Sequence, residues 1–220
     1  PNPVLGTNVF RLPETMRWED AATIEPLSVA CFDVRRSEIR PNETVVIIGA
    51  GMIGQCIVQV CKATSTCKVV VSEPNQFRMS VARQLGADHV VNPHQTDLFE
   101  FVRQSTEGEM AGVVFECAGS TPALMQAISV LQPFGRLMQV ATYERSLELT
   151  PEIMYRAFQL GNIRWQGCGR QQWSQAVELM EKGQINTANL ITHKFPLDRI
   201  KEAFETQIGA PEAIKVMVEP

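Results

Sequence analysis

Three glycines stand at the spacing that a dinucleotide-binding turn requires. Gly49, Gly51 and Gly54 form the pattern G-x-G-x-x-G directly after the apolar run VVII, and a helical pattern follows. Gly49 permits a tight turn, Gly51 lets backbone approach a pyrophosphate, and Gly54 allows close packing of helix and sheet. The N–H groups at the start of the helix, from Met52 through Ile53 to Gly54, would attract the phosphates together with the helix dipole. Because a strand precedes the motif and a helix follows it, the context favours a dinucleotide site.

An acidic residue follows the second predicted strand at the distance expected for a ribose contact. Glu73 stands 19 residues after Gly54, at the end of the run CKVVVS. Its carboxylate would accept hydrogen bonds from the ribose hydroxyls and repel a 2′-phosphate, which favours NAD over NADP. The alternative is a solvated loop charge. Arg78 could welcome a phosphate, but a surface position or stacking on adenine is the preferred interpretation.

The elements that must position these residues alternate regularly along the chain. Runs rich in β-branched residues predict strands over 44–48, 68–72, 89–91, 112–116, 136–140 and 162–165. Helical patterns follow most of them, one beginning with Thr121 as N-cap and Pro122 at the first helical position, and another over 151–160. This alternation predicts an α/β protein with a doubly wound, six-stranded parallel sheet of the Rossmann type.

Further cofactor contacts are expected where the parallel strands end, because the ligand crevice opens there. This position nominates Cys117-Ala118-Gly119 after the fourth strand and Val140-Ala141-Thr142 after the fifth. Each segment could equally be an ordinary strand-exit turn.

The two ends of the chain do not continue the alternation. We predict a dinucleotide-binding domain over 27–164, and remnants of a second lobe over 1–26 and 165–220. The second remnant contains an amphipathic helix from Trp173, strands over 190–195 and 214–218, and a helix around Phe204.

Composition excludes several classes of protein. The net charge is −4 and no Lys/Arg-rich block occurs, so a nucleic-acid partner has no electrostatic support. No apolar run approaches the roughly 20 residues of a membrane span. The N-terminal residues lack a signal-peptide pattern, and we predict a cytoplasmic protein. The first residue is Pro1, so the chain is expected to start inside a longer reading frame or to result from processing.

Cysteines and histidines give no metal site. The six cysteines contain no Cys-x-x-Cys pair, and most stand in apolar runs, where they are expected to be free and buried. The histidines His89, His94 and His193 are scattered, and none has metal-ligand spacing.

Several stretches in order along nearly the whole chain resemble the medium-chain, zinc-type alcohol dehydrogenase family, and within it the polyol (sorbitol-like) and threonine dehydrogenases. The matching stretches are RLPETMRWEDAATIEPLSVA, VVIIGAGMIG, VVVSEPNQFRMSVARQLGAD, VVFECAGS, FGRLMQVA and LITHKFPLDRIKEAFE. The resemblance implies oxidation of a secondary alcohol with hydride transfer to NAD.

The resemblance also implies roles for individual residues. Cys117 and Ala141 would line the nicotinamide half of the cleft, and Cys168 and Arg170 would offer backbone groups to the carboxamide. Glu73 stands where the family usually has Asp. Glu25, in the stretch EPLSVA, falls where related enzymes place a glutamate near the catalytic zinc.

The chain departs from the family pattern at its start. Family members carry an N-terminal barrel-like domain that supplies the zinc ligands, and no match to it occurs here. A catalytic zinc takes about three protein ligands, so Glu25 alone could not hold the metal. We therefore expect an NAD-binding portion that is inactive alone, with zinc only in a full-length parent and no catalytic residue identified.

The sequence leaves two alternative functions open, and it also predicts a homodimer. The chain could instead be a non-catalytic dinucleotide-binding or protein-interaction module, or a module for another adenine-containing ligand such as a methyl donor. A homodimer is expected through an edge strand near 146–149, as in the family.

Overall fold

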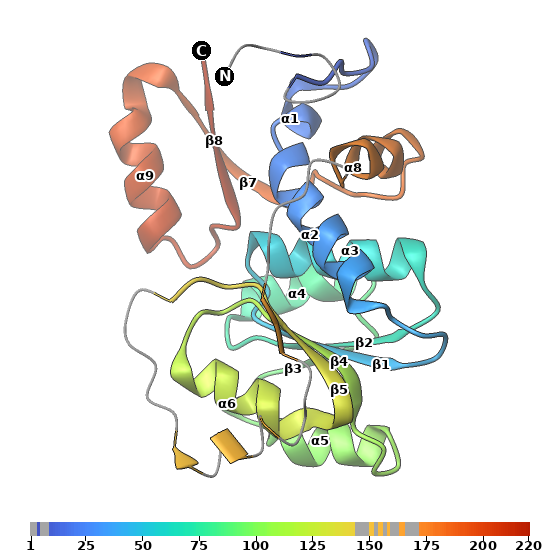
Figure 1. Cartoon of the computed structure of the whole chain (residues 1–220). Coiled ribbons are helices and arrows are strands. Elements are labelled where there is room, and N and C mark those ends of the chain that lie inside the picture. Colours follow the sequence, from blue (N-terminus) through green and yellow to red (C-terminus); the bar gives the residue numbers. More distant parts are fainter. Residues whose placement is uncertain are drawn as a thin grey trace.

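A twisted parallel sheet forms the centre of the molecule (Figure 1). The computed structural model describes residue 4, residues 9–143, residues 150, 151, 154, 155 and 158, the backbone of 163–165, and residues 172–220. The body of the sheet consists of β1 (Thr44–Ile48), β2 (Lys68–Ser72), β3 (His89–Val91), β4 (Ala111–Glu116) and β5 (Leu131–Gln139), and the short β6 (Ile163–Trp165) pairs with β5. The order is β3-β2-β1-β4-β5-β6 and all pairs are parallel, so the prediction of a doubly wound sheet is confirmed.

Helices cover both faces of this sheet. One face carries α2 (Ile24–Ser37), α3 (Met52–Thr64) and α4 (Gln76–Gln84), and the other carries α5 (Leu98–Ser105) and α6 (Thr121–Val130) (Figure 1). Strand β1 shows why: Val45 and Ile47 join the first apolar cluster, whereas Val46 and Ile48 join the second. Because successive side chains point to opposite faces, a strand with consecutive apolar residues must be covered on both faces.

The start of the fifth strand and the N-cap of α6 differ from their predicted positions. The fifth strand was expected over 136–140, but β5 begins at Leu131, because Pro133-Phe134-Gly135 continue as an irregular part of the strand with Phe134 at φ +59°. The N-cap of α6 is Ser120, whose hydroxyl accepts from the Ala123 N–H (3.3 Å), rather than Thr121.

Other sequence predictions have mixed outcomes. Of the six cysteines, the five that the structure describes are free, and four of those are buried, as expected. The predicted dimer edge at 146–149 and most of the predicted helix over 151–160 lie outside the described residues. Among the helices of the described part, none is long and apolar enough to cross a membrane.

Helix α2 was not predicted, and the domain boundary expected between residues 26 and 27 falls inside it. Its apolar face consists of Leu27, Ala30, Cys31 and Val34, all buried, at the spacing i, i+3, i+4, i+7. That spacing is the signal that the sequence analysis missed. The face packs against α3 and against α8 (Gln172–Glu181).

Helix α2 carries one fully buried carboxylate, that of Asp33. Asp33 has no exposed surface, and among the described residues neither of its oxygens has a hydrogen-bond partner. Burial raises the pKa of Asp33 from 3.8 to about 7, while the nearby Arg36 opposes the shift. Since the folded chain holds this proton more tightly than the unfolded chain, Asp33 costs stability as pH rises from about 4 to about 7.

We predict that Asp33→Asn removes this pH dependence. At pH 4 the variant and the native chain should have similar free energies of unfolding, whereas at pH 8 the variant should be more stable by roughly 2–4 kcal/mol. Urea denaturation at both pH values measures the difference, with the exposed Asp198→Asn as the matched control. A native chain whose stability does not fall between pH 4 and pH 7 relative to Asp33→Asn would contradict the assignment.

The C-terminal segment forms a separate two-stranded sheet. Strands β7 (Ile191–Pro196) and β8 (Lys215–Glu219) pair in parallel, connected by η1 (Leu197–Arg199) and α9 (Ile200–Gly209). This unit lies beside the short helix α1 (Trp18–Ala21), at one end of the molecule (Figure 1).

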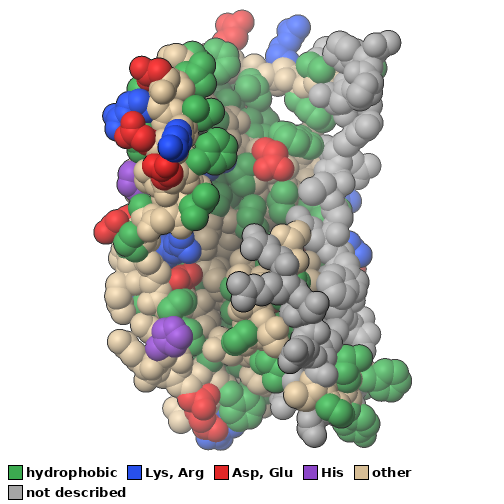
Figure 2. All heavy atoms as spheres, turned by 90° about the vertical axis from the view of Figure 1, so that its left-hand side faces the viewer, with side chains coloured by type: hydrophobic (Ala, Val, Ile, Leu, Met, Phe, Trp, Pro, Cys, Tyr) green, Lys and Arg blue, Asp and Glu red, His purple; other side chains and the backbone are tan. Residues whose placement is uncertain are grey.

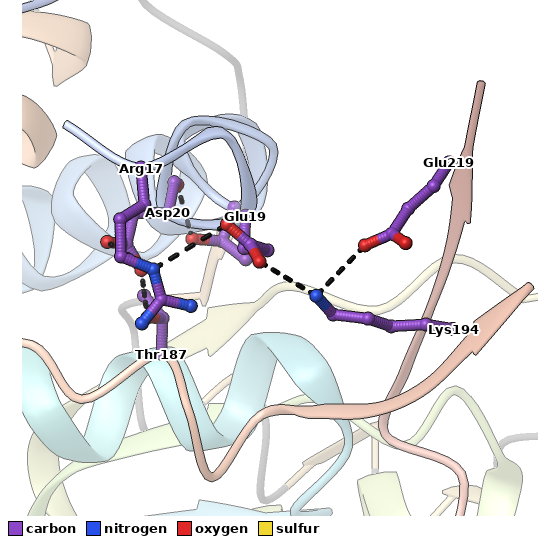
Figure 3. Close-up of polar contacts among 7 residues, drawn as sticks. Arg17, Glu19, Asp20, Thr187, Lys194 and Glu219 are labelled. Carbon is purple, nitrogen blue, oxygen red and sulfur yellow. Dashed lines mark hydrogen bonds and ion pairs between the residues drawn. The ribbon is translucent and has the colours of Figure 1, made fainter. Parts of the chain in front are cut away.

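Polar contacts tie the two ends of the chain together (Figure 3). The Lys194 ammonium lies 2.7 Å from Glu19 Oε1 and 2.9 Å from Glu219 Oε1. The Thr187 hydroxyl donates to the Asp20 carboxylate. Residues near the start of the chain are thus held against β7 and β8, which are distant in sequence.

Candidate functional site

The glycine motif forms the turn between β1 and α3, at the point where the strand order reverses. Gly49 adopts φ +93°, and a Cβ there would lie 3.1 Å from the Cβ of Ala118 in the turn after β4. A Cβ on Gly54 would lie 2.0 Å from the carbonyl oxygen of Gly49. The tight turn and the close approach of helix and loop therefore both require glycine.

Gly51 differs from the other two. It is the N-cap of α3 with φ −70°, a value that any residue adopts, and a Cβ there would meet no atom within 4 Å. No side chain caps the helix. The first N–H groups of an α-helix have no partner within the helix, so those of Met52, Ile53 and Gly54 need acceptors from outside α3.

Glu73 closes the turn from the side of β2. It is only 4% exposed. The Ala50 N–H donates to its Oε2 (2.7 Å), and the Asn75 N–H donates to its Oε1 (2.9 Å). The alternative of a solvated loop charge is wrong. The carboxylate holds the glycine turn against the end of β2, and each oxygen keeps a second lone pair for a further donor.

Arg78 joins α4 to the C-terminal segment. Its guanidinium donates to the carbonyl oxygen of Ala213 (3.0 Å), in the segment before β8. Its own carbonyl oxygen accepts from the side-chain amide of Gln55 (2.9 Å), which also donates to the Ala50 carbonyl (3.1 Å). Gln55 is fully buried and was not singled out from the sequence. It connects the glycine turn, α3 and α4.

The turns after β4 and β5 meet on the other side of the reversal point. A Cβ on Gly119 would lie 2.6 Å from the carbonyl oxygen of Thr142 and 3.4 Å from the Cβ of Ala141. The Cys117 N–H donates to the Ile48 carbonyl (2.8 Å), which joins this turn to β1. The structure thus brings Cys117 and Ala141 to the same edge as the glycine turn.

Glu116 organises both turns, and the sequence analysis did not identify it. Its carboxylate is fully buried at the end of β4. It accepts hydrogen bonds from the turn after β4 and from two side chains of the β5 end, Gln139 and Tyr143. The available signal was an acidic residue that ends the apolar run VVF.

Cys117 is not an activated nucleophile. Burial raises the pKa of its thiol well above 9, and the charges of Glu116 and Asp33 raise it further. A thiol that stays protonated is neither a good nucleophile nor a metal ligand at neutral pH.

The described residues do not fit a catalytic zinc. No group of three His, Cys, Asp or Glu side chains among them could hold a metal ion. Glu25 is exposed on the first turn of α2. Cys168 and Arg170 lie outside the described residues.

Comparison with known proteins agrees with this geometry. The profile of the family described as "Zinc-binding dehydrogenase" matches residues 53–182. The fold also matches the crystal structure of 2R,3R-butanediol dehydrogenase from Bacillus subtilis, with a TM-score of 0.86 and 28% identity, over 96% of this chain and 60% of that one.

Curated relatives extend the match to nearly the whole chain. A 2-dehydro-3-deoxy-L-galactonate 5-dehydrogenase from Pseudoalteromonas atlantica is 36% identical over 98% of this chain and 62% of its own length. An L-threonine 3-dehydrogenase from Thermococcus kodakarensis is 34% identical over 92% of this chain and 58% of its own. The chain thus spans about 60% of the length of these relatives. From the profile match and this similarity, the chain belongs to the zinc-binding dehydrogenase family.

Proposed function

We propose that this chain is the NAD-binding portion of a dehydrogenase that oxidises a secondary alcohol, a polyol or an amino alcohol, by hydride transfer to NAD. Two of the relatives named above are dehydrogenases of L-threonine and 2R,3R-butanediol, and both substrates carry secondary hydroxyl groups. In this proposal the chain binds and positions NAD, which accepts the hydride. The substrate class is inferred from the relatives.

The observation that carries the proposal is the open space at Gly51. Neither its φ angle nor any neighbour requires glycine there, in contrast to Gly49 and Gly54. A glycine with no use in packing, at an uncapped helix N-terminus, is explained by a ligand that must come close to the backbone. The pyrophosphate of a dinucleotide is such a ligand.

Two contacts favour NAD over NADP. The Glu73 carboxylate stands at the end of β2, where a ribose hydroxyl would donate to it and a 2′-phosphate would be repelled. The guanidinium of Arg78 donates to the Ala213 carbonyl oxygen, so one of its N–H groups is not available to a 2′-phosphate.

The remaining cofactor contacts would be made with the nicotinamide and its carboxamide. Cys117 and Ala141 would line the nicotinamide half, and Cys168 and Arg170 would present backbone groups to the carboxamide.

The proposal also includes a second lobe built from residues 1–26 and 165–220. The contacts of Lys194 with Glu19 and Glu219 support this lobe, because they join its two segments.

Zinc enters this proposal only through a longer parent protein. The described residues offer no group of three metal ligands, so in this proposal the zinc ligands of the whole dehydrogenase are not among them. The chain by itself would bind NAD without oxidising alcohols. Polyol oxidation by the purified chain with stoichiometric zinc would refute this part.

The surface of α9 favours the alternative of a protein-interaction module as a second candidate. Large apolar side chains are exposed there, with Phe204 64% and Ile208 85% exposed. Hydrophobic side chains also gather in the upper half of the face that Figure 2 shows. Such patches mark contact surfaces. The predicted homodimer and cytoplasmic location stay predictions, and light scattering tests the first.

Calorimetric titration of NADH into the native chain and into Gly51→Val tests the binding proposal. We expect saturable binding to the native chain and at least tenfold weaker binding to Gly51→Val, because the added side chain fills the space that the pyrophosphate needs. The melting temperatures of the two proteins should agree within about 3 °C. Equal affinities would contradict the proposed site.

A further inference from the structure

We propose that the buried carboxylate of Glu116 makes the nicotinamide half of this site prefer the oxidised cofactor over the reduced one. The inference rests on the proposed function and adds a specificity-determining charge to it. It starts from the hydrogen bonds of one side chain.

Glu116 accepts four hydrogen bonds. The N–H groups of Ala118 and Gly119 donate to Oε1 over 2.8 Å and 2.9 Å. The side-chain amide of Gln139 and the hydroxyl of Tyr143 donate to Oε2, each over 2.7 Å. A single carboxylate therefore fixes the turns that follow β4 and β5.

All four partners are neutral donors, which is the environment of an ionised carboxylate. Among the ion pairs of the described residues, none involves Glu116. The negative charge is thus buried and solvated by dipoles, but it is not cancelled by a cation. The charge lies directly beneath the turn that follows β4, because Oε1 accepts from the Ala118 and Gly119 N–H groups of that turn.

The position of this charge relative to the cofactor follows from the fold. A dinucleotide lies across the reversal point between β1 and β4, with one mononucleotide on each half of the sheet. Glu73 marks the adenosine half at β2, so the ends of β4 and β5 belong to the nicotinamide half. The nicotinamide ring carries a positive charge in NAD⁺ and none in NADH. A fixed negative charge nearby therefore stabilises the bound oxidised form selectively.

The test compares the ratio of the dissociation constants, Kd(NAD⁺)/Kd(NADH), in the native chain and in Glu116→Gln. The substitution keeps the shape of the side chain and removes its charge. We expect Kd(NAD⁺) to rise about tenfold and Kd(NADH) to change much less, so that the ratio rises about tenfold. Tyr143→Phe is the matched control, because it removes one donor and keeps the charge. Its ratio should stay within about twofold of the native value.

A second variant covers the case in which Glu116→Gln does not fold. Gln139→Lys places an ammonium beside the carboxylate and cancels its charge, and it should raise the ratio in the same direction. An unchanged ratio, with both affinities lowered together, would overturn the inference and leave Glu116 a purely structural role. If the native chain binds neither NAD⁺ nor NADH, the proposed function itself fails and the inference with it.

Discussion

Replacing Gly54 with alanine is expected to lower the free energy of unfolding by about 3 kcal/mol, at the upper end of the usual cost of overpacking. The new Cβ would lie 2.0 Å from the carbonyl oxygen of Gly49. That atom belongs to the backbone, so α3 or the whole turn must move. The movement also displaces the helix N-terminus, and NADH binding should be lost. Urea denaturation followed by circular dichroism measures the stability.

Gly51→Ala is the matched control for this prediction. It adds the same methyl group three residues earlier, at a position with no atom within 4 Å of the added Cβ. Its free energy of unfolding should stay within about 1 kcal/mol of the native value. If both variants lose the same stability, the distinction between a packing glycine and a ligand glycine is wrong.

Arg136→Met is expected to lower the free energy of unfolding by about 3–5 kcal/mol, because it leaves a buried charge unpaired. The Arg136 guanidinium pairs with the Glu43 carboxylate, and their side chains are only 5% and 12% exposed. Glu43 precedes β1 and Arg136 lies in β5, so the pair joins the amino-terminal side of β1 to a strand two positions away in the sheet. Thermal and urea denaturation measure the loss.

Two further variants separate charge from packing. Adding Glu43→Gln to Arg136→Met should recover much of the loss, since no uncompensated charge remains, and the amide oxygen can still accept from the Arg40 N–H. Arg103→Met breaks an exposed pair with Glu100 and should cost much less stability than Arg136→Met, because solvent screens exposed pairs. If Arg103→Met and Arg136→Met lose the same stability, burial does not determine the contribution of these ion pairs, and the prediction is wrong.

Much of the sheet and the cofactor turn could be predicted because their signals are local. The strand at 44–48 is apolar from Val45 to Ile48, and the glycines that follow need only their own spacing to be recognised. The role of Gly54 depends on Gly49, five residues away. Helix α2 had an equally local signal in the spacing of Leu27, Ala30 and Val34.

The parts that could not be predicted depend on contacts between distant residues. Glu116 looks like the polar end of a strand, and only the fold brings Gln139 and Tyr143 to its carboxylate. The contact of Arg78 with Ala213 spans 135 positions, and it takes up one N–H of the guanidinium. Asp33 would pass for a solvated helix residue, yet the packing of α2 buries it completely.

The central claim is that this chain holds an NAD-specific cleft, and one measurement tests it most directly. NADH is titrated into the native chain while energy transfer from tryptophan to nicotinamide is followed, with NADPH as the comparison. The account predicts saturable binding of NADH, at least tenfold tighter than that of NADPH, because the Glu73 carboxylate repels a 2′-phosphate. Equal binding of both would contradict the role of Glu73, and binding of neither would show that the Gly49–Gly54 turn does not form a competent site in this chain.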